Sequence, residues 1–216
     1  MATMKKNDSV KAFTRWLSQN ARKEWEMACN TNPARGTVYD QSWFLARFDR
    51  DGDDCGASKA VHLLDYIVVK RHQYCGYLPE KRNQFATGNQ LIDEINCWQR
   101  FAQLPEADLL CPVLKYFTSK SDKVSATCET MQRNVVIIAQ KAVYVSDALS
   151  CCKKAERLNA ENGCLTGESA HRRFEKLRRF SESQNWRDAL YNGGNSGVIY
   201  DYDLKCYKAV FIDYAL

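Results

Sequence analysis

The sequence predicts an α+β fold in which a strand-rich half precedes a helix-rich half. In the first half, short runs of apolar and β-branched residues have strand-like lengths, at 42–48, 59–63, 66–70, 111–117 and 135–140. In the second half, apolar residues recur at helical spacing over 144–160 and 168–182. Two further runs, 198–202 and 207–212, then predict a closing hairpin that turns near Asp203 and Leu204.

The size and composition are those of a folded protein of moderate size. The chain has 216 residues, of which 45% are hydrophobic, so it can bury one ordinary core or the cores of two small lobes. The net charge is +5, from 31 basic and 26 acidic residues. This mildly basic balance does not by itself indicate a nucleic-acid partner.

The cysteines indicate free thiols rather than a framework of disulfides. There are ten, and apart from the adjacent pair Cys151 and Cys152 they are scattered singly, with no C-x-x-C motif and only three histidines in the chain. A zinc site is therefore not expected. The polar start and the lack of a long apolar stretch predict a cytoplasmic protein that does not enter a membrane, with a secreted disulfide protein as the alternative.

The first part of the chain predicts a helix followed by an antiparallel meander. Apolar residues at helical spacing predict a helix over 8–28, with Ser9 as its N-cap: Val10, Phe13, Trp16 and Leu17. A turn at 30–36 follows, and then the strand at 42–48. The polar segment 50–56 is expected to be a tight loop before two strands that turn at Leu64 and Asp65, which completes a three-stranded meander.

The middle of the chain predicts a helix and two strands. Over 89–103 an apolar stripe recurs at helical spacing with Glu94 beside it, formed by Leu91, Ile95, Trp98 and Ala102. The run 135–140 is apolar at successive positions, which predicts a central strand that is buried on both faces.

The end of the chain carries polar residues that could act on a nucleotide. Asp188 and Asn195 frame a glycine-containing loop, and Asp213 follows the apolar run 209–212. Carboxylate and amide oxygens are ligands that can hold a divalent cation together with a triphosphate.

Taken in order, these pieces resemble the protein-kinase-like fold, and most closely the short truncated kinase-like proteins of bacteriophages. The segment Gly56-Ala-Ser58-Lys-Ala-Val-His is similar to a phosphate-covering loop, although the full G-x-G-x-x-G is absent. The strand that ends at Lys70 and the helix that carries Glu94 follow in the expected order. The segment 137–142 resembles the strand and hinge against which adenine lies.

The resemblance implies a strand-rich N-lobe and a reduced helical C-lobe that ends at a metal-binding Asp turn. Residues 36–142 would form the N-lobe, an antiparallel sheet with one helix. Residues 143–216 would form a truncated C-lobe with a hairpin like a catalytic loop, and residues 1–35 would be an N-terminal helical extension.

The resemblance also implies a binding site for ATP and Mg²⁺. Lys70 would contact phosphate oxygens, and Glu94 would hold its long side chain in place. The remaining nucleotide contacts would come from Gly56, Ser58, Gln140 and Ala142. The ordinary alternatives are a solvated strand end for Lys70 and the wet face of an amphipathic helix for Glu94.

In the same resemblance, Asn195 and Asp213 would bind magnesium, and Asp188 would accept the proton of the substrate hydroxyl. Three departures argue against ordinary catalysis. Asn195 is seven positions after Asp188, whereas the H-R-D-x-x-x-x-N pattern gives five; the last residue of the Asp turn is Ala215; and the chain ends one residue later.

The function we expect is therefore that of a non-catalytic or weakly catalytic kinase-like protein, a pseudokinase, which binds a host or regulatory protein in the host cytoplasm. The alternative is an ATP-dependent phosphotransferase. Five aromatic residues near the end of the chain are candidate interface anchors, with ordinary hairpin packing as the alternative: Trp186, Tyr191, Tyr200, Tyr202 and Tyr207.

A third hypothesis is nucleic-acid binding through the basic helix at 171–180. Phe174, Leu177 and Phe180 would face the core and leave the arginines outward as a basic stripe. A solvated helix face explains the same pattern.

Overall fold

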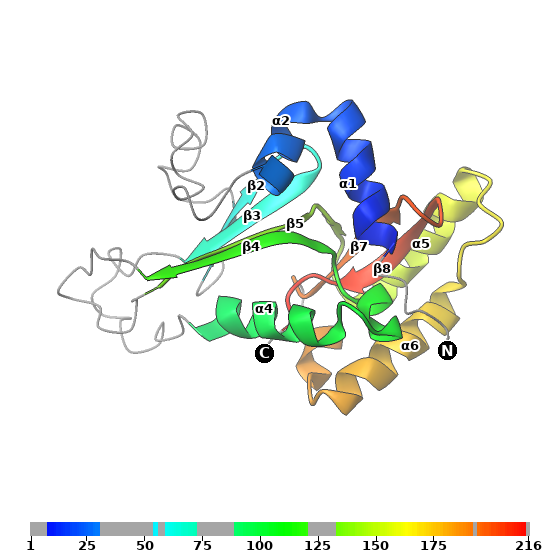
Figure 1. Cartoon of the computed structure of the whole chain (residues 1–216). Coiled ribbons are helices and arrows are strands. Elements are labelled where there is room, and N and C mark those ends of the chain that lie inside the picture. Colours follow the sequence, from blue (N-terminus) through cyan, green and yellow to red (C-terminus); the bar gives the residue numbers. More distant parts are fainter. Residues whose placement is uncertain are drawn as a thin grey trace, which may run out of the picture.

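The structure, a computed structural model, describes residues 8–30, 54–55, 59–72, 89–120, 133–191 and 194–214. These form two antiparallel sheets with helices packed around them (Figure 1), so the predicted α+β class is confirmed. The larger sheet has the strand order β1-β2-β3-β5-β4, from β1 (Asp54–Cys55), β2 (Lys59–Leu63), β3 (Ile67–His72), β4 (Val113–Lys120) and β5 (Arg133–Gln140). The smaller sheet has the order β6-β7-β8, from β6 (Val143–Tyr144), β7 (Ser196–Asp201) and β8 (Cys206–Phe211).

The central strands of the larger sheet are those with the most apolar sequences. β5 lies between β3 and β4, and its residues Ile137 and Ile138 are fully buried, which confirms that this strand is central. The prediction for 50–56 was wrong in part, because Asp54 and Cys55 pair with Val61 and Ala60 and extend the sheet. The strand expected at 42–48 lies outside the described residues.

The two faces of this sheet are covered by different helices. Because side chains alternate along a strand, Val68 faces the opposite way from Ile67 and Val69. Val68 belongs to the core cluster that contains the apolar stripe of α4 (Asn89–Phe101), as predicted for this helix. Ile67 and Val69 belong instead to the cluster formed with the N-terminal helices.

The N-terminal segment is not one continuous helix. It forms α1 (Asp8–Asn20), the single turn α2 (Arg22–Trp25) and the π-helical turn η1 (Glu26–Asn30), with a break at Ala21. Phe13 and Leu17 are buried against the larger sheet. Ser9 is not the N-cap, because it lies inside α1 and its hydroxyl donates a hydrogen bond to Asp201 Oδ2 at 2.8 Å.

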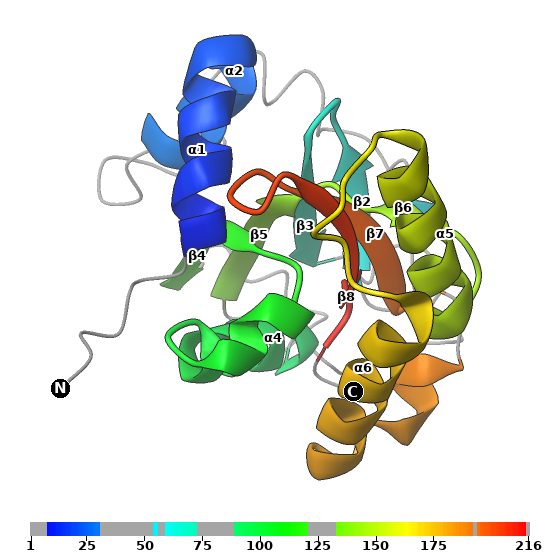
Figure 2. The same ribbon diagram turned by 90° about the vertical axis from the view of Figure 1, so that its right-hand side faces the viewer.

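The second half of the chain packs two helices against the smaller sheet. α5 (Ala148–Glu161) contacts β7, β8 and α6 (Ala170–Ser183), and Figure 2 shows these helices together on one side of the β7–β8 hairpin. The predicted hairpin is confirmed, with its turn at 202–205 between Asp201 and Cys206. The short 3₁₀ helices η5 (Pro105–Leu109) and η6 (Arg187–Leu190) were not predicted.

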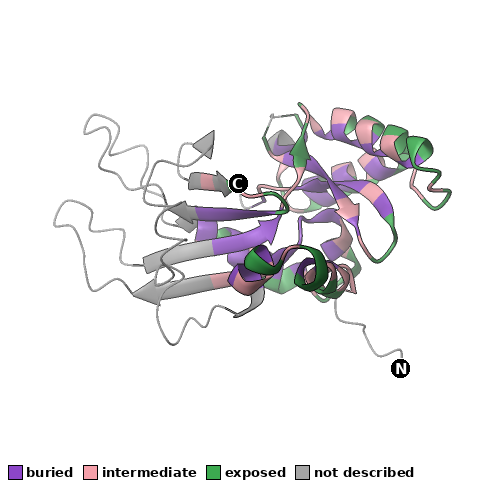
Figure 3. Cartoon of the chain, turned by 90° about the horizontal axis from the view of Figure 1, so that it is seen from above, coloured by how far each residue is buried: buried purple, intermediate pink, exposed green. Residues whose placement is uncertain are grey.

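The two sheets share one apolar core. Leu110 forms a parallel bridge with Phe211, and the amide of Cys111 donates to the carbonyl of Phe211 at 2.8 Å. The largest core cluster accordingly contains residues of β3, β5 and α4 together with residues of α5, α6, β7 and β8. Figure 3 shows in purple where buried residues lie along the described strands and helices.

Candidate functional site

Lys70 and Glu94 form a buried ion pair between the larger sheet and α4. The Nζ of Lys70 lies 2.5 Å from Oε1 of Glu94, and their side chains are 9% and 1% exposed. Lys70 lies on β3 opposite Val61 on β2 and Ile137 on β5, so its backbone is held on both sides. The solvated alternatives for these two residues are therefore wrong.

The charges around Lys70 keep its ammonium protonated inside the protein. Burial by itself would lower the pKa of Lys70, but the carboxylates of Glu94 and Asp213 outweigh it and raise that pKa. The structure thus brings together a lysine and two carboxylates from three segments that are far apart in the sequence.

The turn after β8 closes over this ion pair. Lys70 Nζ also donates to the carbonyl oxygen of Ile212 at 2.5 Å, and it lies 6.0 Å from the centre of the Tyr214 ring. Tyr214 is fully buried, and its hydroxyl donates to the carbonyl of Cys111 at 3.1 Å. The turn is therefore held at two points, by the bond from Lys70 to Ile212 and by the bond from Tyr214 to Cys111.

Asn195 and Asp213, the predicted metal ligands, are joined through their backbones. The carbonyl of Asn195 accepts hydrogen bonds from the amides of Ile212 at 2.9 Å and Asp213 at 3.4 Å. Among the described residues, no group of three histidine, cysteine or acidic side chains could hold a metal ion.

The predicted hinge residues make contacts with the smaller sheet. Gln140 is buried, and its side-chain amide donates to the carbonyl of Tyr200 at 2.7 Å. Its backbone amide donates a hydrogen bond to the carbonyl oxygen of Pro112 at 3.0 Å. Ala142 packs against Gly197 so closely that a Cβ added to the glycine would lie 2.8 Å from the Cβ of Ala142.

Three predicted site residues cannot be placed in full. Gly56 and Ser58 lie outside the described residues. Asp188 lies in η6, between α6 and β7, and nothing is described of its side chain. The next two residues, Ala189 and Leu190, are buried in the core and hold η6 in place.

Sequence reasoning missed the part that Tyr214 and the Ile212 carbonyl play around Lys70. The signal for Tyr214 was its place directly after Asp213, where the D-F-G turn of the kinase-like fold has an aromatic residue. No sequence signal identifies Ile212, because its contribution is a backbone carbonyl.

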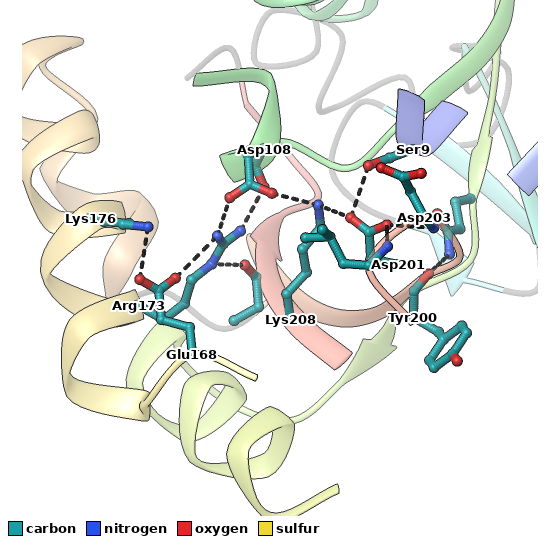
Figure 4. Close-up of polar contacts among 12 residues, drawn as sticks. Ser9, Asp108, Glu168, Arg173, Lys176, Tyr200, Asp201, Asp203 and Lys208 are labelled. Carbon is teal, nitrogen blue, oxygen red and sulfur yellow. Dashed lines mark hydrogen bonds and ion pairs between the residues drawn. The ribbon is translucent and has the colours of Figure 1, made fainter. Parts of the chain in front are cut away.

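A cavity of about 560 Å³ lies away from this site, and charged residues line much of it. Asp108 accepts hydrogen bonds from Arg173 and, at 2.6 Å, from Lys208, as Figure 4 shows. Lys208 also donates to Asp201 at 2.6 Å. Burial would raise the pKa of Asp108, but the neighbouring Arg173 and Lys208 hold it below its usual range.

The basic stripe expected on the helix at 171–180 was wrong for Arg173, which is buried and donates to Asp108 and to the carbonyl of Ala209. Glu168 pairs with Lys176 at 2.8 Å, and Arg178 pairs with Glu175 at 2.8 Å and with Glu182 at 2.7 Å. Acidic residues therefore neutralise much of the positive charge on this helix.

Most of the aromatic residues proposed as interface anchors pack within the protein. Trp186 contacts Phe180 and Phe211, and Tyr200 contacts both Tyr202 and Tyr207 with ring centres 5.0 Å apart. Tyr202 also stacks on Phe13 of α1. Tyr191 is the exception among the five, with 70% of its surface exposed.

No protein-family model matches this chain, and a search of curated proteins finds no match. Within the part of the chain that the structure describes, no helix has both the length and the apolar character needed to cross a membrane.

Proposed function

We propose that this chain is a kinase-like protein that binds Mg-ATP beside Lys70, transfers phosphate weakly or not at all, and acts by binding a host or regulatory protein. One observation carries the nucleotide part of the proposal. Lys70 on β3 is paired with Glu94 on α4 and lies in the electrostatic field of Asp213, after β8. A kinase-like phosphate site would have its lysine, glutamate and aspartate in the same order, which supports the proposal.

Lys70 would contact the nucleotide through its ammonium group. An ammonium has three N–H donors, of which Glu94 and Ile212 accept two among the described residues. The third could be directed at a phosphate oxygen. Glu94 and the Ile212 carbonyl would hold the ammonium in place, which reduces the ordering that nucleotide binding would require.

The metal would arrive with the nucleotide. Asp213 and Asn195 offer two hard oxygen donors on backbones that are hydrogen-bonded to each other. Because Mg²⁺ in such sites takes one or two protein ligands plus phosphate oxygens, we expect it to bind as Mg-ATP and not as the free ion.

The weak or absent catalysis in this proposal rests on the loop between Asp188 and Asn195. A spacing of seven would displace one of these residues from the usual geometry, and Ala215 replaces the glycine of the metal-binding turn. A phosphotransferase is the second candidate, because η6 holds the backbone of Asp188 shortly before β7.

The test is a thermal shift of the full chain with Mg-ATP, with ATP in excess EDTA and with MgCl₂ alone. A ligand that binds only the folded state raises the unfolding midpoint by mass action, by roughly 5–10 °C at a hundredfold excess over its Kd. We expect Mg-ATP to raise the midpoint, MgCl₂ alone to have no effect, and Asp213→Asn to lose the response.

Asp203→Asn is the matched control, because Asp203 is exposed in the β7–β8 turn. It should respond to Mg-ATP as the native chain does. The absence of any shift at millimolar Mg-ATP in the native chain would overturn the nucleotide proposal. An equal shift in Asp213→Asn would overturn the assigned metal site.

A further inference from the structure

Two thiols that lie far apart in the sequence are close to each other at the edge of the smaller sheet. Cys164 is in the loop between α5 and α6, and Cys206 is the first residue of β8. Both are free, and each thiol lies close enough to the other to affect its pKa. Neighbouring thiols can form a disulfide where their Cα atoms lie roughly 4–7 Å apart.

Asn159 holds the two backbones together. The amide of Cys164 donates to the carbonyl of Asn159 at 2.8 Å, which fixes the start of the loop. The side chain of Asn159 is buried; its Nδ2 donates to the carbonyl of Tyr207 at 2.8 Å, and its Oδ1 accepts from the amide of Tyr207 at 2.6 Å. The proximity of Cys164 to Cys206 is therefore built into the fold.

The two cysteines have different surroundings. Cys164 is partly exposed and lies 3.3 Å from Thr166 Oγ1. The hydroxyl of Thr166, followed by backbone N–H groups and the Cys206 side chain, lowers the pKa of Cys164. Burial raises the pKa of Cys206 to about 11. Cys164 is thus suited to be the attacking thiolate and Cys206 to be the resolving thiol.

The charged cavity reaches Cys206 and the loop that carries Cys164. Cys206, Thr166 and Gly167 all contribute to its lining. One wall comes from the α5–α6 loop and another from the β7–β8 hairpin, so a bond between Cys164 and Cys206 would join two walls of the same cavity.

We propose that Cys164 and Cys206 are a redox-modification site, at which a small-molecule disulfide such as oxidised glutathione forms a reversible Cys164–Cys206 bond. The Cys164 thiolate attacks the glutathione disulfide, forms a mixed disulfide and releases one glutathione thiolate. Cys206 then gives its proton to the released glutathione thiolate and attacks the sulfur of Cys164, which forms the protein disulfide and releases the second glutathione as its thiolate. The two protein thiols are oxidised by two electrons, and one glutathione disulfide is reduced.

The four other cysteines whose side chains the structure describes are poorer sites. Cys111 is buried, and burial raises its pKa to about 12. Burial also raises the pKa of Cys97 to about 12, although Cys97 is partly exposed. Cys151 and Cys152 are adjacent in α5, and both are buried in the core.

The experiment incubates the full-length native chain with oxidised glutathione and maps the products by peptide mass spectrometry without reduction. We expect a Cys164–Cys206 cross-linked peptide that is two hydrogens lighter than its parts and disappears with dithiothreitol. The unfolding midpoint of the oxidised protein should rise by roughly 5 °C or more.

Two variants separate the steps. Cys206→Ser should stop at the mixed disulfide between Cys164 and glutathione, because the resolving thiol is absent. Cys97→Ser is the matched control and should form the cross-link as the native chain does. A native chain that keeps the mixed disulfide, pairs a different cysteine with Cys164, or leaves Cys164 unmodified would overturn the proposal. The outcome is independent of nucleotide binding.

Discussion

The ammonium of Lys70 lies 2.5 Å from the carboxylate of Glu94, and both side chains are almost wholly buried. A buried ion pair adds little net stability, because the desolvation of two charges offsets their attraction. Removing one partner is different, because it leaves the other charge buried and without compensation. This asymmetry allows a stability test that does not depend on any bound nucleotide.

We expect Lys70→Met to lower the free energy of unfolding by about 3–5 kcal/mol, because Glu94 then remains buried without its partner. The double variant Lys70→Met with Glu94→Met should recover most of this loss. Urea unfolding of the native chain, both single variants and the double variant gives the coupling energy. Lys153→Met, at an exposed position of α5, is the control and should change stability by about 0.5 kcal/mol or less. Additive effects of the two single variants would contradict the pairing.

The charge network around Lys208 predicts a loss of stability in acid. Burial would raise the pKa of Asp201, but Lys208, the Leu204 amide and the Ser9 hydroxyl outweigh it and lower that pKa. The contribution of Asp201 is therefore fully present above its unfolded pKa of about 4, and it is lost as the pH falls towards the lower folded pKa.

The measurement is urea unfolding of the native chain and Asp201→Asn between pH 7 and pH 3. The native chain should be the more stable above pH 5, and its advantage should shrink below about pH 4. Asp203→Asn, in the same turn but exposed, is the control for the substitution itself. A constant advantage over Asp201→Asn down to pH 3 would contradict the prediction.

The hydrogen bonds of Glu24, in α2, indicate that the N-terminal helices stabilise the turn between β2 and β3. Its buried carboxylate accepts hydrogen bonds from the amides of Asp65, Tyr66 and Ile67 at 3.2, 3.0 and 2.9 Å. Glu24→Ala leaves these donors without their acceptor and should cost about 2–3 kcal/mol. Hydrogen exchange should show faster exchange at residues 65–67. Glu26→Ala, which removes an exposed pair with Arg22, should leave these amides protected.

The uncharged side chain of Asn159 is expected to contribute strongly to the stability of the fold. Asn159→Ala removes two hydrogen bonds to the backbone of Tyr207, and we expect it to lower the free energy of unfolding by about 2–3 kcal/mol. Asn162→Ala, whose exposed side chain donates to the carbonyl of Leu158, should cost about 1 kcal/mol or less. Thermal unfolding of both variants tests this prediction. Equal losses of stability in the two variants would contradict it, because the buried hydrogen bonds of Asn159 would then contribute no more than the exposed bond of Asn162.

Periodicity in the sequence predicted the main elements well. The stripe of Leu91, Ile95 and Trp98 identified α4, and the apolar run before Gln140 identified the central strand. The two runs around Asp203 identified the hairpin. These patterns are local consequences of burial, because residues on one buried face must recur with the period of the helix or strand.

Periodicity in the sequence did not predict which charged side chains are buried. Arg173 and Glu94 belong to residue types that periodicity assigns to the outside, yet both are buried with opposite charges from distant segments. Whether a charge can be buried depends on a partner of opposite sign in space, and sequence spacing does not report that partner.

The sequence by itself determined the α+β class, the order of the main helices and strands, and the closing hairpin, since these depend on local patterns of apolar residues. Only the tertiary structure decided that Lys70 meets Glu94 and the carbonyl of Ile212, that Ser9 reaches Asp201, and that Cys164 lies near Cys206. Each of these contacts joins elements that the packing of the shared core brings together, and the energy that holds them depends on distance and burial in three dimensions.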